Sequence, residues 1–201
     1  MDDTSDVYKM ITKPSEEILF KDKKSKFYGY AFPIAVEAEV KPLIEEIKRK
    51  HPSANHICYA WQLGVENMTY RANDDGEPNN SAGMPIYGQL QSFGVTNILV
   101  AVARIFGGTQ LGVGGLITAY RTTAQLTLEA SKIGERTLKQ YFRLSFQYAK
   151  MDIIMRTIKQ RKLKIVSQKL EMDCEITISV RKMDAQSIKE IFEAIYGIEI
   201  R

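Results

Sequence analysis

The sequence predicts an α+β protein of two domains, and three observations lead to this prediction. First, 201 residues with 44% hydrophobic content are enough to bury one large core or two small ones. Second, segments with strand-like alternation and segments with helical periodicity follow one another along the chain. Third, a linker-like stretch at 132–136 precedes a new strand–helix pattern. We therefore expect one domain over residues 1–135 and a second over residues 136–201.

The elements expected early in the first domain follow from hydrophobic spacing. Alternating apolar residues predict the strands, and apolar residues at a 3.6-residue period predict the helix. In chain order they are a polar lead-in (8–18), a strand hairpin (18–33) with a basic turn (21–25), a helix (36–50) and two strands that can pair (56–63 and 69–72).

The most polar segment of the chain, residues 73–85, is predicted to be a loop because Asp-Gly and Pro-Asn dipeptides favour turns. Pro85 suits the first turn of a following helix. Asp74, Asp75 and Glu77 are candidate binding residues, since oxygen ligands on a loop suit hard cations and paired acids suit proton transfer. They do not follow the EF-hand pattern, so a hydrogen-bonded turn explains them equally well.

A glycine-rich segment, residues 104–121, follows an apolar run at 97–104 that predicts a central strand covered on both faces. It carries five of the chain's 13 glycines, and a helix is expected from Leu116 to Ser131. A strand, a glycine loop and a helix in this order can hold an anion on backbone N–H groups. Neither the P-loop nor the dinucleotide fingerprint is complete. The candidate ligand- or nucleic-acid-binding residues here are Arg104, Gly107, Gly108, Gly112, Gly114, Gly115 and Arg121.

Two interpretations of Arg104 stay open. The planar guanidinium can donate two hydrogen bonds to a phosphate group. It can equally pair with Asp74, Asp75 or Glu77 and so pin residues 73–85, the acidic loop, to the glycine-rich segment.

The histidines and cysteines do not indicate a metal or catalytic centre. His51 and His56 are five residues apart, which suits no helical ligand pair, and a structural role near a helix end and in a strand is favoured. Cys58 and Cys174 form no Cys-x-x-Cys pair and are expected to be reduced and structural. No catalytic constellation can be assigned from spacing, so we predict no catalytic residue, metal or cofactor, and a non-enzymatic protein is favoured.

The second domain is expected to follow the order strand, helix, strand, strand, helix, strand, which is that of the ferredoxin-like fold. Its first helix, over residues 151–162, has an apolar side and a basic side. Residues 132–201 carry 15 Lys and Arg against nine Asp and Glu, whereas residues 1–131 carry 13 against 15. This excess suits contact with RNA, although a solvated surface also explains it. The candidate phosphate contacts are Arg156, Lys159, Arg161 and Lys162.

Four ordered blocks together resemble the IMPACT/YigZ family. They are Lys24–Phe27, the pattern His-Pro-x-Ala-x-His-x-Cys-Tyr-Ala at 51–60, Asp74–Pro78, and Arg-x-Phe-Gly-Gly-x-x-Leu-Gly-x-Gly-Gly-Leu at 104–116. The resemblance implies an N-terminal domain similar to domain 2 of ribosomal protein S5 and a C-terminal domain similar to a module of translation elongation factor G. It also implies translational control, in which eukaryotic relatives are regulators. Gln110 stands where the family often has a cation.

The leading functional hypothesis is a cytoplasmic protein that binds RNA or the ribosome, regulates translation and has a protein partner there. No membrane contact is expected, since no apolar run reaches the roughly 18 residues of a membrane span. Two alternatives stay open. An enzyme that binds a phosphorylated small molecule or nucleotide predicts a concave pocket over Gly112–Leu116, whereas RNA binding predicts an open positive face. A protein-interaction module predicts an exposed apolar patch.

Overall fold

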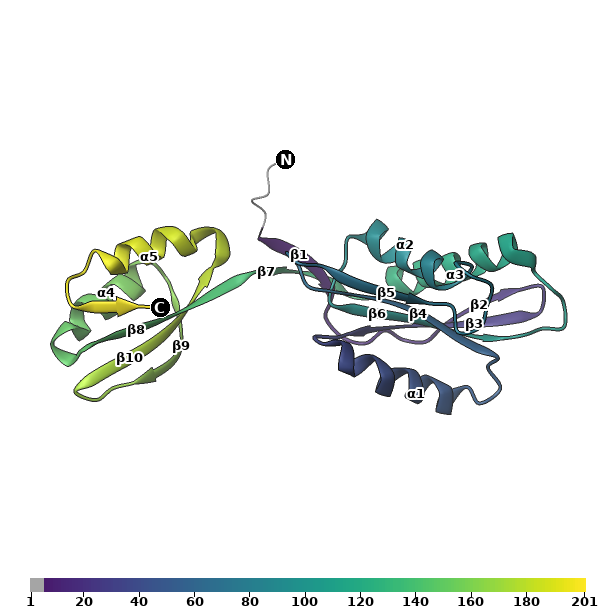
Figure 1. Cartoon of the computed structure of the whole chain (residues 1–201), viewed down its shortest axis with the longest axis horizontal. Helices are drawn as coiled ribbons and strands as arrows, with labels where there is room; N and C mark the ends of the chain where they lie inside the picture. The colour runs from purple at the N-terminus through teal and green to yellow at the C-terminus, as the bar shows by residue number, and fades with distance from the viewer. Residues whose placement is uncertain (1–5) are drawn as a thin grey trace. The chain divides into compact units, whose positions relative to one another are not determined.

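The computed structural model describes residues 6–201, which form helices and antiparallel sheets (Figure 1). The described chain divides into two compact units. One unit is Tyr8–Arg136, and the other contains Thr137–Arg201 together with Asp6 and Val7. Each unit has its own hydrophobic core. The predicted mixture of helices and strands is confirmed.

A five-stranded antiparallel sheet forms the centre of the unit Tyr8–Arg136. Every residue of its middle strand from Ile98 to Arg104 is buried, which confirms the prediction of a central strand covered on both faces. The strand order is β2 (Ile18–Asp22), β3 (Ser25–Pro33), β6 (Ile98–Ile105), β4 (His56–Leu63) and β5 (Thr69–Asn73).

Helices cover both faces of this sheet (Figure 1). The helix α1 (Val40–Lys50), which follows a short 3-10 turn at Glu37–Glu39, packs Ile47 against one face of β6. The helices α2 (Gly83–Phe93) and α3 (Gly112–Glu129) share the core on the other face. This layering fixes the C-terminal end of β6 beside the start of α3.

Two short strands replace segments that the sequence predicted to be a polar lead-in and a linker. β1 (Val7–Ile11) pairs with β7 (Ile133–Thr137) in a separate two-stranded sheet. Both predictions were wrong because a five-residue strand is defined by its hydrogen-bonded partner. Here the partner lies at the far end of the unit's sequence, beyond the reach of any local pattern.

The helix α3 begins at Gly112 and not at Leu116, so the glycine-rich loop is shorter than predicted. Three of the five glycines, Gly112, Gly114 and Gly115, belong to the first turn of the helix. Glycine is a poor helix former in isolation. The buried residues that follow, from Leu116 onward, stabilise the helix and overcome this preference.

The other unit contains a four-stranded antiparallel sheet in the order β11 (Ile198–Ile200), β8 (Lys139–Gln147), β10 (Asp173–Arg181) and β9 (Lys164–Lys169). The helices α4 (Met151–Gln160) and α5 (Ala185–Glu193) bury their apolar sides in one core with this sheet. Short 3-10 turns at Tyr148–Lys150 and Lys182–Asp184 lead into the two helices. The predicted order strand, helix, strand, strand, helix, strand is confirmed.

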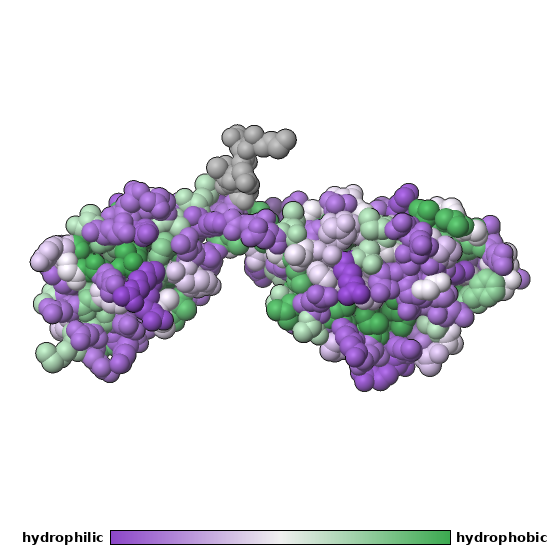
Figure 2. Space-filling model, in the orientation of Figure 1, coloured by the Kyte–Doolittle hydropathy of each residue, from purple (hydrophilic) through white to green (hydrophobic). Residues whose placement is uncertain are grey.

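Hydrophilic residues cover most of the visible surface of each unit, with smaller apolar patches between them (Figure 2). Phe106 and Val113, which lie within the glycine-rich segment, are among the exposed apolar side chains. Within residues 6–201, no helix is long and apolar enough to cross a membrane.

Candidate functional site

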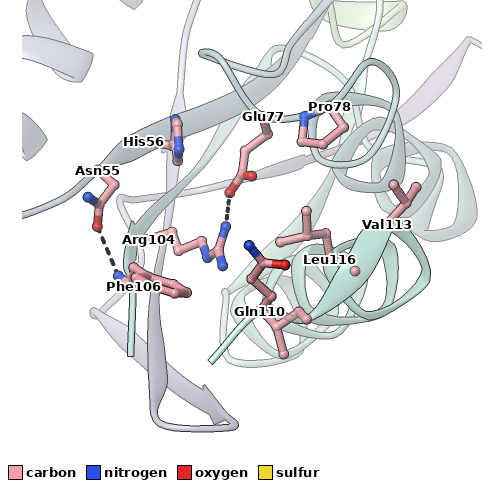
Figure 3. Close-up of a pocket in the computed structure, with 11 residues that line it drawn as sticks. Asn55, His56, Glu77, Pro78, Arg104, Phe106, Gln110, Val113 and Leu116 are labelled. Atoms are coloured by element: carbon pink, nitrogen blue, oxygen red, sulfur yellow. Dashed lines mark hydrogen bonds and ion pairs between the residues drawn. The ribbon is translucent and has the colours of Figure 1, made fainter. Parts of the chain in front are cut away.

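A pocket of about 440 Å³ opens where the end of β6 meets the start of α3 (Figure 3). The acidic loop and the glycine-rich segment, which lie far apart in the sequence, both contribute to its wall. The structure therefore brings these two predicted segments together. The lining residues are Asn55, His56, Glu77, Pro78, Arg104, Phe106, Gln110, Leu111, Gly112, Val113 and Leu116.

Arg104 is buried in this wall and paired with the acidic loop. Its Nη1 donates a hydrogen bond to Glu77 Oε1 at 2.6 Å, and the two side chains are only 9% and 4% exposed (Figure 3). The guanidinium lies 5.7 Å from the ring centroid of Phe27 and 5.6 Å from that of Phe106. Arg104 Nε is buried without a hydrogen-bond partner among the described residues. Of the two interpretations of Arg104, the ion pair with the acidic loop is confirmed.

Glu77 is held by a second donor that the sequence did not reveal. The Tyr120 hydroxyl donates to Glu77 Oε1 at 2.8 Å. The Cys58 thiol lies 2.9 Å from the Asp74 carbonyl oxygen, the nearer acceptor for its one proton, and 3.3 Å from the Tyr120 oxygen. Burial raises the pKa of both groups, so they stay protonated and act as donors. A tyrosine at core spacing on a helix carries no signal for such a role. The network fixes the acidic loop against β4 and α3.

Asp74 organises the backbone of the acidic loop. Its carboxylate accepts hydrogen bonds from the backbone N–H groups of Asn80 at 2.9 Å, Ala82 at 3.0 Å and Gly83 at 2.8 Å. The last two groups lie at the start of α2, so Asp74 caps that helix. Backbone groups of the protein therefore take up this carboxylate, as expected for a hydrogen-bonded turn.

Asp75 and the histidines also make structural contacts. Asp75 Oδ2 accepts a hydrogen bond from Ile57 N at 2.6 Å, and His56 Nδ1 donates to the Asp75 carbonyl at 2.7 Å. His51 ends α1, and its Nε2 lies 3.5 Å from Glu17 Oε2. Both histidines make the local contacts expected near a helix end and in a strand, and His56 also lines the pocket.

Gly107 is a packing glycine. A Cβ at this position would lie 2.1 Å from the carbonyl carbon of Lys24, and the Gly107 N–H donates to Ser25 Oγ at 3.1 Å. Any side chain would therefore push the basic turn between β2 and β3 away from the end of β6. Gly107 serves the close approach of these two backbones.

Other glycines of the segment border open space. Apart from chain neighbours and the helix's own backbone, no described atom lies within 4 Å of where a Cβ would stand at Gly108, Gly112 or Gly114, whereas a Cβ at Gly115 would lie 3.0 Å from the Leu111 Cβ. Gly108 and Gly112 have positive φ angles of 86° and 71°, which favour glycine for conformational reasons. These positions leave room beside the start of α3.

The N-terminus of α3 is not capped by the side chain of its own N-cap residue. Its N-cap residue, Leu111, makes no side-chain hydrogen bond, and the first turn contains no acidic residue. The first N–H groups of a helix have no intrahelical partner and carry partial positive charge. Arg121 lies on the exposed side of the same helix and does not line the pocket.

The four cations predicted on the basic helix belong to the C-terminal unit. Arg156 and Lys159 lie on the exposed side of α4, and Arg161 and Lys162 directly follow it. None of the four forms an ion pair within the described chain. They line no part of the pocket.

The fold and the pocket define a two-unit protein of helices and antiparallel sheets in which a buried Arg–Glu pair lies beside a glycine-rich helix start. The family model described as the Impact N-terminal domain matches residues 23–128, more than half of the chain. This chain belongs to the IMPACT family, which confirms the resemblance found in four sequence blocks.

Curated relatives agree with this assignment. The IMPACT family member YigZ of Escherichia coli is 34% identical over 148 residues, which are 72% of each chain. The IMPACT family member YvyE of Bacillus subtilis is 35% identical over 126 residues, 63% of this chain but only 58% of YvyE. The match thus spans less than two thirds of YvyE.

A solved crystal structure of a hypothetical protein has the same fold. Its TM-score is 0.69 at 24% sequence identity, and the match covers 96% of both chains. The similarity therefore extends over both units and not only over the family domain.

Proposed function

We propose that this chain is a cytoplasmic, non-enzymatic protein of translational control that binds RNA or the ribosome and has a protein partner there. Membership in the IMPACT family supports the link to translation, because eukaryotic relatives regulate it. The observation that carries RNA binding is the set of exposed cations on and after α4 without ion-pair partners in residues 6–201.

The finer fold assignments belong to the same proposal. The sheet order β11-β8-β10-β9, with two helices on one core, supports a ferredoxin-like C-terminal domain over residues 136–201. The family assignment supports an N-terminal domain, residues 1–135, that resembles domain 2 of ribosomal protein S5.

The placement of the cations on α4 suits phosphate contact. Ile154 and Ile158 anchor one side of the helix in the core, so Arg156 and Lys159 are held on the outer side. Each cation that neutralises a phosphate releases condensed counterions, and binding then weakens as salt is added. Cations near a helix C-terminus also interact favourably with the helix dipole, and this stabilising role alone predicts no RNA affinity.

The test is fluorescence anisotropy of the full chain with a labelled RNA, titrated at several salt concentrations. We expect the affinity to fall steeply from about 50 to about 200 mM salt, with a logarithmic slope of roughly −0.7 per phosphate contact on a single strand. Affinity that is absent at low salt, or unchanged across this range, would contradict RNA binding.

A matched pair of variants tests the surface. Lys159→Ala removes a cation without an ion-pair partner in the described chain, whereas Lys189→Ala removes one on α5 that pairs with Glu193 at 3.6 Å. Each loses one charge, so an equal loss of affinity would show that net charge and not α4 drives binding. We expect only Lys159→Ala to reduce the salt slope, by about 0.7. Crosslinking in cell lysate should recover ribosomal RNA.

A phosphorylated small molecule is the second candidate ligand, because a specific observation favours it. The pocket is concave and is lined by Gly112, Val113 and Leu116, as that alternative predicted. A ligand that binds only the folded state raises the melting temperature with its concentration. Thermal denaturation with and without nucleotides tests this candidate, and no shift at millimolar nucleotide would argue against it.

A further inference from the structure

We infer that the pocket between β6 and α3 binds one unpaired nucleotide of RNA, with the base against Phe106 and the phosphate at the start of α3. The inference rests on the proposed RNA binding and adds which form of RNA is recognised and where. The pocket has the chemistry of a nucleotide unit, which combines a flat apolar face, a polar edge and an anionic group.

The walls of the pocket match a base in size and polarity. Its volume of about 440 Å³ falls in the range of small-molecule sites, roughly 300–1,000 Å³. Phe106, Pro78 and Leu116 provide apolar surface, while the Gln110 amide stands beside Arg104 at the rim (Figure 3). An amide both donates and accepts hydrogen bonds, so it can meet the polar edge of any base.

Phe106 is held in place before any ligand arrives. Its side chain is 44% exposed, yet its backbone N–H donates to Asn55 Oδ1 at 2.9 Å, and the Arg104 guanidinium lies 5.6 Å from its ring centroid (Figure 3). The N–H group of the next residue, Gly107, donates a hydrogen bond to Ser25 Oγ. A fixed, exposed aromatic ring loses little conformational freedom when a base stacks on it.

Charge in and around the pocket favours a phosphate. The start of α3 offers N–H groups that its own N-cap residue leaves uncapped, beside open space at Gly112 and Gly114. A second observation in the same wall is the buried Arg104, whose Nε has no partner in the part of the chain that the structure describes. Because Glu77 neutralises much of the Arg104 charge, a further source of positive charge is needed.

The basic turn between β2 and β3 provides that source. Lys23 and Lys24 are exposed at its tip, and the Lys24 backbone packs directly against Gly107, next to Phe106. Lysines at this position can contact the neighbouring phosphates of a strand whose base enters the pocket. This turn was noted in the sequence as basic, but only the contact with Gly107 places it beside the pocket.

A concave pocket was the expectation for a small molecule and an open positive face that for RNA in general; among forms of RNA, a concave pocket accepts an unpaired nucleotide. A base inside a duplex is stacked and paired, so it cannot enter a pocket without breaking those interactions. Single-stranded segments, bulges and ends present bases that stack freely on aromatic side chains. We therefore expect the wild-type chain to bind a short single-stranded RNA at least tenfold more tightly than the duplex formed with its complement.

The variant test compares Phe106→Leu with Tyr70→Leu. Phe106→Leu keeps an apolar side chain but removes the aromatic face, and Tyr70 is a 53% exposed aromatic residue on β5 of the same unit that does not line the pocket. We expect Phe106→Leu to weaken single-strand binding about tenfold, while Tyr70→Leu and duplex binding change little. Phe106→Tyr should restore affinity, and melting curves should show that all variants fold.

The outcomes separate this inference from the proposed function. Equal affinity for single strand and duplex, unaffected by Phe106→Leu, would overturn the inference and leave RNA binding intact. No RNA binding by the wild-type chain at low salt would overturn both. Binding of adenosine monophosphate that depends on Phe106, without any binding of RNA, would assign the pocket to free nucleotides. That result would overturn the inference that the bound nucleotide belongs to RNA.

Discussion

Arg104 of the N-terminal unit and the cations of α4 in the C-terminal unit lie in opposite environments. In the N-terminal unit, Arg104 is buried between two aromatic rings and paired with Glu77. In the C-terminal unit, Arg156 and Lys159 are exposed and form no ion pair with a residue that the structure describes. A buried pair affects folding strongly when one partner is lost, whereas an exposed cation contributes little to stability and stays available for a ligand. Burial, more than charge, separates these two roles.

The largest expected effect comes from breaking the buried pair. Arg104→Met should lower the free energy of unfolding by about 3–5 kcal/mol, because Glu77 would be left as a buried charge without its ion-pair partner. Lys159→Met should change it by no more than about 0.5 kcal/mol. Urea denaturation measures both. Similar losses of unfolding free energy in the two variants would contradict the distinction between the buried and the exposed cation.

The next effect is loss of the cap on α2. Asp74→Ala should lower the free energy of unfolding by about 2 kcal/mol, since three backbone N–H groups lose their acceptor. Asp74→Asn keeps an acceptor oxygen in place and should cost less. If Asp74→Ala instead leaves stability unchanged and removes ligand binding, the acidic loop belongs with the binding groups.

A smaller effect should divide the glycines. Gly107→Ala should lower the free energy of unfolding by about 1–3 kcal/mol, because its Cβ would collide with the Lys24 backbone. Gly114→Ala should raise it by about 0.5–1 kcal/mol, since the new methyl group meets no described atom and alanine favours the helix. Thermal or urea denaturation compares them, and equal effects would contradict the division into packing and open positions.

The smallest effect concerns pH. Asp6 accepts hydrogen bonds from Arg181, and these bonds, followed by the Met183 N–H and the nearby guanidinium charge, hold the pKa of Asp6 below its ordinary value. Arg181 is 46% exposed, so solvent weakens the pair. The unfolded chain takes up the Asp6 proton near pH 4, before the folded chain does.

The stabilisation by Asp6 is therefore complete above about pH 4 and disappears as the pH falls through the lower folded pKa. We expect the unfolding free energy of the wild-type chain to decrease more between pH 5 and pH 2 than that of Asp6→Asn, measured by urea denaturation at each pH. An identical pH dependence for both chains would show that Asp6 is not coupled to folding.

Much of the architecture can be predicted from local sequence patterns. Spacing that repeats within a few residues predicts the buried strand from Ile98 to Arg104, the helix that ends before His51 and the order of elements after residue 137. The four family blocks likewise lie within short segments. The sequence also limited the interpretations of Arg104 to a phosphate contact or an ion pair with the acidic loop, and the ion pair is the one observed.

The rest depends on contacts between distant segments. Three features arise from neighbours that are remote in sequence. They are the pairing of β1 with β7, the hydrogen-bond network of Tyr120 and Cys58 next to Glu77, and the difference in surroundings between Gly107 and Gly114. A glycine looks the same in the sequence whether a backbone or open space lies beside it. Folding decides which, because close packing of the β2–β3 turn on β6 buries one side of the glycine-rich segment and leaves the start of α3 open.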